Sequence, residues 1–273
     1  MLFVSDVHDS PEALRLLVET GEEVVILGDL VNLTDYRTGE GAVAEVLGID
    51  FASRTSAARA EGDYPRMRML WREEAEVTGE DLRRKITGEL TGQYERAAEA
   101  LGGGHGLVIH GNVDRPEMMR ETLPEGFRYV HGEVVERDGL RLGFVGGGVA
   151  TPLGVAGEVS DDEMRSILED LGPVDVLCTH VAPAISPLRT DVVTGREERG
   201  SDPVRDYLVE SQPLFHLFGD VHQPQASTWR VGRTRCLNAG YFRATGRFLR
   251  LEGSTVHVGS IPTRSGPQAG QAR

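Results

Sequence analysis

The sequence predicts an α/β fold built on a parallel β-sheet. Two short apolar runs, Leu2–Val4 and Val24–Leu27, flank a segment with helical signals. In that segment Ser10 can cap a helix, Pro11 fits the first helical position, and leucines follow at helical spacing. A strand–helix–strand unit of this kind makes its two strands parallel neighbours.

A second observation is that five apolar, strand-like runs each end in a polar side chain that can bind a metal. These side chains are Asp6 and His8, Asp29, Asn112 and Asp114, His180, and Asp220 and His222. Positions i and i+2 of a strand project from the same side, so an Asp-x-His pair offers a two-point grip on a metal ion. We expect all five ends to meet at one edge of a sheet, where open α/β sheets bind their ligands.

The order of these motifs resembles that of the calcineurin-like metallophosphoesterases. The resemblance covers about residues 1–250 and rests on Asp6-x-His8, Gly28-Asp29, Gly111-Asn112-x-Asp114, His180 and Gly219-Asp220-x-His222. It implies a four-layer α/β/β/α sandwich with a helical insertion.

The resemblance also implies a site for two divalent metal ions. One ion would be held by Asp6, His8, Asp29 and His222, and the other by Asp29, Asn112, His180 and Asp220. A metal-bound hydroxide would then be the nucleophile, Asn112 a catalytic residue, and Asp114 a residue that orients ligands. The mixture of carboxylate, amide and imidazole suits Mn, Fe or Zn, and the oxygen-rich second position favours Mn.

Three residues depart from the family's usual pattern. Asp220 stands where a histidine is usual, so the second metal position has an oxygen ligand in place of a nitrogen ligand and is a harder site in the sense of ligand chemistry. Val113 stands where many members carry a histidine that protonates the leaving group, and this absence favours phosphodiesters or activated esters. Asn32 replaces a common aspartate and predicts weaker support for the ligands.

We expect one metallophosphoesterase domain over residues 1–260, with a helical insertion over about 34–102 and a disordered tail over 261–273. Three helices are predicted in the insertion, with Thr78 and Asp81 as a capping box at the start of the third. Ordinary helix packing and a cap that selects substrate are both open readings. Tyr36, Arg37, Tyr64 and Trp71 are the residues to test for a cap.

Further along, strand-like alternation predicts a hairpin of residues 128–135 and 140–145 around Asp138-Gly139. Residues 228–258 predict an antiparallel second sheet. His110 lies next to the third motif, and a structural role is expected for it.

Composition narrows the class of protein. A formal net charge of −14 argues against a nucleic-acid partner and leaves room for a small phosphorylated substrate. No apolar run is long enough for a membrane span, and the first strand begins at Met1, so we expect a cytoplasmic protein. The two cysteines, Cys178 and Cys236, are expected to be buried thiols. The oligomeric state is open.

The leading functional hypothesis is a metal-dependent phosphoesterase acting on a phosphomonoester or phosphodiester. The first alternative is a binding or scaffold protein that keeps the fold with a degraded metal site, as Asp220 and Val113 would suggest. The second is a metal hydrolase acting on amides or lactones.

Overall fold

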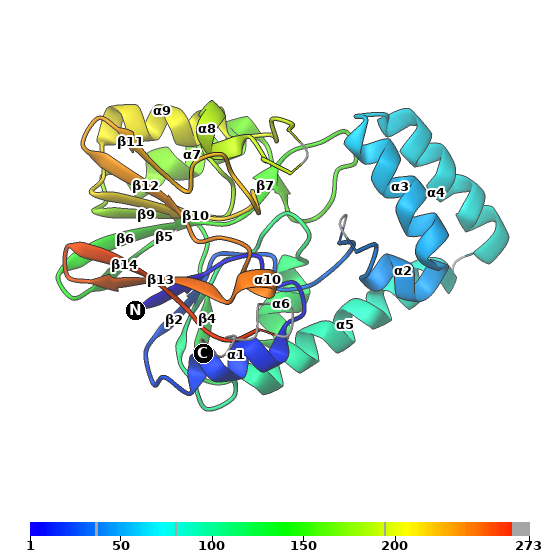
Figure 1. The fold of residues 1–273 in the computed structure, drawn as a ribbon, viewed down its shortest axis with the longest axis horizontal. Coiled ribbons are helices and arrows are strands. Elements are labelled where there is room, and N and C mark those ends of the chain that lie inside the picture. Colours follow the sequence, from blue (N-terminus) through cyan, green and yellow to red (C-terminus); the bar gives the residue numbers. More distant parts are fainter. Residues whose placement is uncertain (36–37, 80, 194, 264–273) are drawn as a thin grey trace, which may run out of the picture.

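The computed structural model describes residues 1–35, 38–79, 81–193 and 195–263. Two six-stranded sheets lie face to face, and helices cover the outer face of each sheet (Figure 1). This arrangement confirms the predicted four-layer α/β/β/α sandwich.

The first sheet carries the first three motifs. Its order is β14 (Thr255–Ser260), β13 (Arg247–Glu252), β1 (Leu2–Val4), β2 (Val24–Ile26), β3 (Gly106–Val108) and β4 (Phe127–Tyr129). Strands β1 to β4 are parallel, and β13 pairs antiparallel with both β1 and β14.

The second sheet carries the last two motifs. Its order is β11 (Thr228–Val231), β12 (Thr234–Asn238), β10 (Phe215–Phe218), β9 (Val176–Thr179), β6 (Leu140–Val145) and β5 (Glu133–Arg137). The four inner strands are parallel, and the two edge strands β11 and β5 are antiparallel to their neighbours. A separate short pair joins β7 (Gly148–Val149) to β8 (Glu158–Val159).

Alternation along the strands divides the core into layers. In β1, Phe3 faces the second sheet, whereas Leu2 and Val4 face the outer helices. The layer between the sheets is apolar and includes Phe144 and Cys178, both fully buried. Both cysteines are buried free thiols, as predicted.

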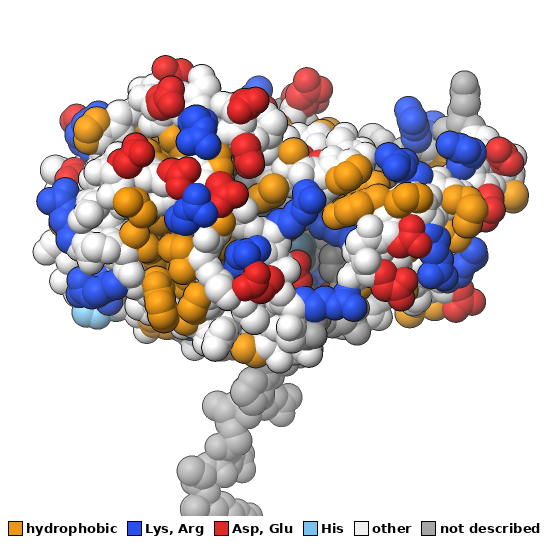
Figure 2. All heavy atoms as spheres, turned by 90° about the horizontal axis from the view of Figure 1, so that it is seen from above, with side chains coloured by type: hydrophobic (Ala, Val, Ile, Leu, Met, Phe, Trp, Pro, Cys, Tyr) orange, Lys and Arg blue, Asp and Glu red, His pale blue; other side chains and the backbone are white. Residues whose placement is uncertain are grey.

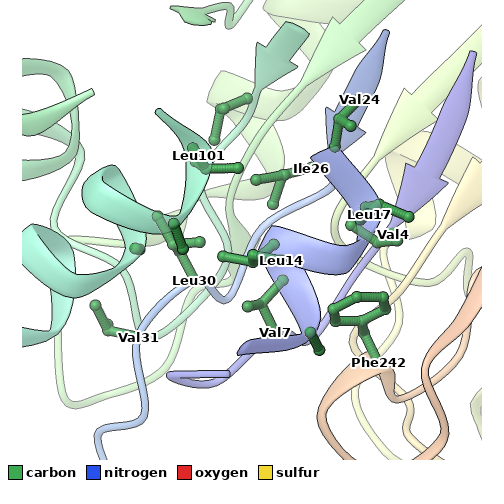
Figure 3. Close-up of a cluster of buried hydrophobic side chains, with 14 of the residues drawn as sticks. Val4, Val7, Leu14, Leu17, Val24, Ile26, Leu30, Val31, Leu101 and Phe242 are labelled. Atoms are coloured by element: carbon green, nitrogen blue, oxygen red, sulfur yellow. The ribbon is translucent and has the colours of Figure 1, made fainter. Parts of the chain in front are cut away.

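The outer layers are helical. Below the first sheet lie α1 (Pro11–Val18), α5 (Asp81–Leu101) and α6 (Pro116–Thr122); over the second lie α7 (Asp161–Leu171), α8 (Ser186–Arg189) and α9 (Asp202–Ser211). Figure 3 shows Leu14 and Leu17 of α1 in the same buried cluster as Val4 and Ile26. Ser10 precedes α1 as predicted, but its side chain makes no cap hydrogen bond.

The insertion, which comprises helices α2 to α5 between β2 and β3, projects to one side of the sandwich (Figure 1). It contains α2 (Ala42–Leu47), α3 (Ile49–Ala60) and α4 (Tyr64–Thr78) before α5, so the prediction of three helices missed α3. The predicted capping box is wrong, because Thr78 is the last residue of α4 and its hydroxyl donates to the carbonyl of Glu74. Phe51 and Trp71 meet edge to face at 5.1 Å in a small core of the insertion's own.

Two predictions about the strands need correction. Residues 128–135 do not form one strand, since β4 joins the first sheet while β5 pairs with β6 in the second. Residues 228–258 do not form a sheet of their own, because β11 and β12 extend the second sheet and β13 and β14 extend the first. A short helix, α10 (Phe242–Thr245), lies between these two hairpins.

Residues 264–273 of the predicted tail, together with Tyr36 and Arg37, lie outside the described residues. In the described part of the chain, no helix combines the length and the apolar content that crossing a bilayer requires.

Candidate metal centre

The five motifs meet where the carboxyl ends of two sheets face each other. Asp6, Asp29 and Asn112 follow strands of the first sheet, whereas His180 and Asp220 follow strands of the second. The prediction of a single sheet edge is therefore wrong, but convergence itself is observed. Figure 2 shows the surface hollowed between the body of the protein and the insertion, with Lys or Arg side chains at its border.

The backbone is strained at the ends of these strands. Five aspartate or histidine residues in the motif loops have a positive φ angle: Asp6 (56°), His8 (43°), Asp9 (58°), Asp29 (53°) and Asp220 (68°). Such values are uncommon outside glycine and concentrate at functional sites. Asp6 and His8 lie beyond the end of β1 in this backbone conformation, and Oδ1 of Asp6 lies 3.9 Å from Nε2 of His8.

Three side chains gather on one side of the site. The Nε2 atom of His222 lies 3.2 Å from Nε2 of His8 and 3.4 Å from Oδ1 of Asp6. The other ring nitrogen of His8, Nδ1, donates to the carbonyl of Val31 at 3.1 Å, which turns Nε2 into the site. These three ligand atoms are close enough together to hold one metal ion.

A second group shares Asp6 with the first. Nε2 of His180 lies 3.5 Å from Oδ1 of Asp29 and 3.7 Å from Oδ1 of Asp220. Its Nδ1 donates to the carbonyl of Leu27 at 2.8 Å, so Nε2 is again the atom that faces the site. Asp6, Asp29 and His180 together could hold a metal ion.

Buried polar atoms without partners test whether these residues fit metal ions. Among the described residues, Oδ1 of Asp6, Oδ1 of Asn112 and Nε2 of His180 are buried and make no hydrogen bond. Leaving such atoms unsatisfied is costly, so each of them calls for a partner such as a bound ion or an ordered water. All three are lone-pair donors on residues that the motifs assign as ligands, and the set therefore fits divalent cations.

Asp114 stands behind the site and joins the loops after β2 and β3. Its carboxylate accepts hydrogen bonds from the backbone N–H groups of Gly111 at 2.8 Å, Leu30 at 3.0 Å and Val31 at 3.3 Å. The Tyr94 hydroxyl of α5 donates to it at 3.3 Å. Asp114 is fully buried, and these contacts hold the loops that carry Asp29 and Asn112.

The carboxylates crowd negative charge into a buried space. Burial tends to raise the pKa of Asp6, but the nearby His222 imidazole lowers it to about 2. Burial raises the pKa of Asp29 to about 7, and it also raises the pKa of Asp220.

Burial and the neighbouring carboxylates also shift the pKa values of the three histidines. Burial lowers the pKa of His8 to about 4. For His180, burial acts downward as well, yet the charges of Asp29 and Asp220 raise its pKa to about 9. Burial likewise opposes the proton on His222, but contact with Asp6 raises its pKa. Protons thus balance part of the negative charge in the absence of cations, and a bound cation would replace them.

The structure also places the three residues that depart from the family pattern. Val113 is buried in the core below the first sheet, so its side chain supplies no proton. Its backbone N–H donates to Oδ1 of Asp29 at 3.1 Å. The side chain of Asp220 is one-fifth exposed and faces His180. Asn32 is buried, with its main chain held by the side chain of Gln93.

Two glycines in the motifs are required by close packing. A methyl group at Gly219 would collide with the side chain of Ser5, and one at Gly111 would collide with Asp29. The two loops are therefore pressed directly against the ligand residues of neighbouring strands.

Some residues of the site were missed from sequence alone. Tyr241 stacks on His222 with ring centroids 4.0 Å apart, and its hydroxyl donates to Asp35 at 2.9 Å. Gln93 was missed because it lies among the apolar positions of α5. A polar residue three positions after Leu90, on the face that the apolar spacing predicts to be buried, was the signal that could have identified it. His110 was given a structural role, and the structure places it in contact with the Tyr129 hydroxyl at 2.7 Å, buried behind the third motif.

Comparisons with solved structures find the same overall fold. One aligns over 96% of this chain and 98% of its own, with a TM-score of 0.61 at 16% identity. TT1561 of Thermus thermophilus aligns over 95% of this chain and 97% of its own, with a TM-score of 0.54 at 15% identity. A candidate 5'-nucleotidase from Staphylococcus aureus, in complex with alpha-ketoglutarate, aligns over 95% of this chain and 52% of its own, with a TM-score of 0.47 at 12% identity.

No protein-family model matches the chain, and neither does any curated protein sequence. The likeness therefore lies in the fold, which two of these structures share with this chain over nearly their whole length. At these low identities it says nothing of substrate.

Proposed function

We propose that this protein is a metal-dependent phosphoesterase that hydrolyses a phosphomonoester or phosphodiester. Two divalent cations, Mn²⁺ favoured, would be bound by the side chains of Asp6, His8, Asp29, Asn112, His180, Asp220 and His222. When bound, the cations would activate water for attack and neutralise charge on the phosphoryl oxygens.

One observation carries the proposal. Ligand atoms from both sheets converge in a buried site, and three of them are left without a hydrogen-bond partner among the described residues. The ion pairs of this cluster join its carboxylates to the imidazoles of His8, His180 and His222, and imidazole is the commonest side chain that binds metal ions.

The surrounding residues act by orientation. The Val31 and Leu27 carbonyls fix the ring planes of His8 and His180. Asp114 holds the loop that presents the Asn112 amide oxygen. These contacts set the ligand geometry before any cation arrives, which lowers the cost of ordering the site upon binding.

The site lacks a proton donor where the family often has one, because Val113 is apolar and buried. Loss of such a general acid typically costs about 10²–10⁴-fold in rate. Substrates with good leaving groups depend least on that proton. We therefore propose diesters or activated esters as the preferred class.

The test uses protein stripped with EDTA and reloaded with Mn²⁺. Initial rates are measured on p-nitrophenyl phosphate, bis(p-nitrophenyl) phosphate and a thioester. We expect Mn²⁺-dependent hydrolysis of the phosphate esters, with the diester the better substrate. His8→Asn should reduce the rate by more than the 10–100-fold typical of residues that only support a metal ligand. His257→Asn, on the exposed face of β14, is the matched control and should retain full activity.

Two results would contradict the proposal, and each would favour a different function. Mn²⁺ binding without turnover of any of the three substrates would favour the scaffold protein with a degraded site. Turnover of the thioester alone would favour a hydrolase acting on carbonyl esters or amides.

A further inference from the structure

Tyr241 lies against both histidines on one side of the metal centre. Its ring is nearly parallel to the His222 imidazole, with centroids 4.0 Å apart and planes 6° apart. The same ring meets His8 edge to face, with centroids 5.7 Å apart. Tyr241 is only 4% exposed, so its ring is a fixed wall of the site.

The backbone beneath this ring is tied to the first motif. Tyr241 forms a parallel bridge with Ser5. The next two N–H groups donate to the carbonyls of Ser5 and Asp6, each at 3.1 Å. These hydrogen bonds therefore hold the backbone of Tyr241 against the strand end that carries Asp6.

The hydroxyl of Tyr241 is held from the opposite side. It donates to Oδ2 of Asp35 at 2.9 Å, and the side chain of Asp35 is only 7% exposed. Oδ1 of Asp35 accepts from the Thr38 N–H at 3.2 Å, and the Asp35 N–H donates to the carbonyl of Glu40. Asp35, itself held by Thr38 and Glu40 at the base of the insertion, thus fixes the far end of the tyrosine.

His222 needs such support more than the other two histidines do. His8 and His180 each use Nδ1 to donate to a backbone carbonyl. Within the described residues, Nδ1 of His222 makes no hydrogen bond, and the side chain is 28% exposed. A histidine that binds metal almost always has its second nitrogen held by a partner, because that partner sets the ring orientation.

We infer that Tyr241 is a positioning residue whose ring, stacked on His222, replaces the missing hydrogen bond and aims Nε2 of His222 at the metal. Parallel aromatic stacking fixes the plane of a ring while leaving its edge nitrogens free. The inference rests on the proposed function only in so far as a metal binds at His8 and His222.

The experiment compares Tyr241→Leu and Tyr241→Phe with Tyr207→Leu. Tyr207 is the matched control, because it is also buried and its hydroxyl also donates a hydrogen bond, in this case to the backbone carbonyl of Gly172, but it lies in α9. In the metal-free protein, the ring current of the stacked tyrosine should shift the His222 ring protons upfield. We expect this shift in the wild type, in Tyr241→Phe and in Tyr207→Leu, and its loss in Tyr241→Leu.

Mn²⁺ binding is then measured by calorimetry on the same proteins. Tyr241→Leu should weaken binding by about 10–100-fold, as is typical when the support of a metal ligand is lost. Tyr241→Phe keeps the stack and should lose far less, while Tyr207→Leu should bind as the wild type does.

Wild-type affinity in Tyr241→Leu, equal losses in Tyr241→Leu and Tyr207→Leu, or no Mn²⁺ binding by the wild type would each overturn the inference. A failure of the proposed function is distinct from these outcomes. A wild type that binds Mn²⁺ without hydrolysing phosphate esters contradicts the phosphoesterase proposal and leaves the role of Tyr241 intact.

Discussion

Replacing Asp114 by asparagine tests how the two loops behind the site are held. An asparagine has one acceptor oxygen where the aspartate has two. If the amide oxygen takes the place of Oδ1, it keeps the bonds from Leu30, Val31 and Tyr94. The amide NH₂ then faces the Gly111 N–H, a donor that now bonds to Oδ2 at 2.8 Å.

The magnitude follows from these contacts. Losing one hydrogen bond to a charged group costs about 1.5–3 kcal/mol, and leaving the buried Gly111 N–H unsatisfied costs about 1–3 kcal/mol. Burial raises the pKa of Asp114, so its ionised form is itself expensive, and the neutral amide recovers part of the loss. We expect a net loss of about 2–4 kcal/mol in the free energy of unfolding.

The assay is urea denaturation of the metal-free protein. Asp81→Asn is the control, because the ion pairs of Asp81 within the described residues, with Arg84 and Lys85, are exposed, and we expect little change. Mn²⁺ affinity of Asp114→Asn should also fall by about 10–100-fold. A variant with unchanged urea midpoint and unchanged Mn²⁺ affinity would refute the reasoning.

Three further predictions concern the backbone, the metal preference and the pH dependence of stability. Gly219→Ala should abolish Mn²⁺ binding in calorimetry, because the new methyl group would displace a loop that carries metal ligands. The control is Gly88→Ala, at an open position in a helix, which should raise the free energy of unfolding by about 0.5–1 kcal/mol and leave Mn²⁺ binding unchanged. Equal Mn²⁺ binding by the two variants would contradict this prediction. Asp220→His should raise the affinity for Zn²⁺ relative to Mn²⁺ in competition titrations, and an unchanged ratio would show that this position does not select the metal. Burial lowers the pKa of His216 to about 3, so the folded state resists protonation that the unfolded chain accepts below about 6.5. The contribution of His216 to the free energy of unfolding is therefore fully present above pH 6.5 and is lost as the pH falls below it. His216→Gln should remove about 2 kcal/mol of the loss that the wild type shows between pH 6.5 and pH 5 in urea titrations. Parallel curves of unfolding free energy against pH for the wild type and the variant would contradict this prediction.

The fold was predictable because its signals are local. The apolar run Leu2–Val4, the helix after Pro11 and the polar group at each strand end could be recognised without knowing any contact. The division into two sheets was not predictable in the same way, because a strand's apolar run does not reveal which sheet it joins. Helix α3 was missed since its alanine, serine and arginine residues give only a weak apolar face.

The candidate site shows the same contrast. Asp6 and His8 were recognised from their spacing, although the positive φ angles that place them depend on packing. The contact of Tyr241 with Asp35 joins residues 206 positions apart, and it depends on how the insertion meets the segment that precedes α10. No periodicity in either segment could predict it.

The central claim is that residues from both sheets converge to bind a pair of cations. Crystals grown with Mn²⁺ and phosphate, measured at the manganese absorption edge, test it most directly. The account predicts two anomalous peaks, one beside Asp6, His8 and His222 and the other beside Asn112, His180 and Asp220. A single peak, or none, in the presence of excess Mn²⁺ would contradict it.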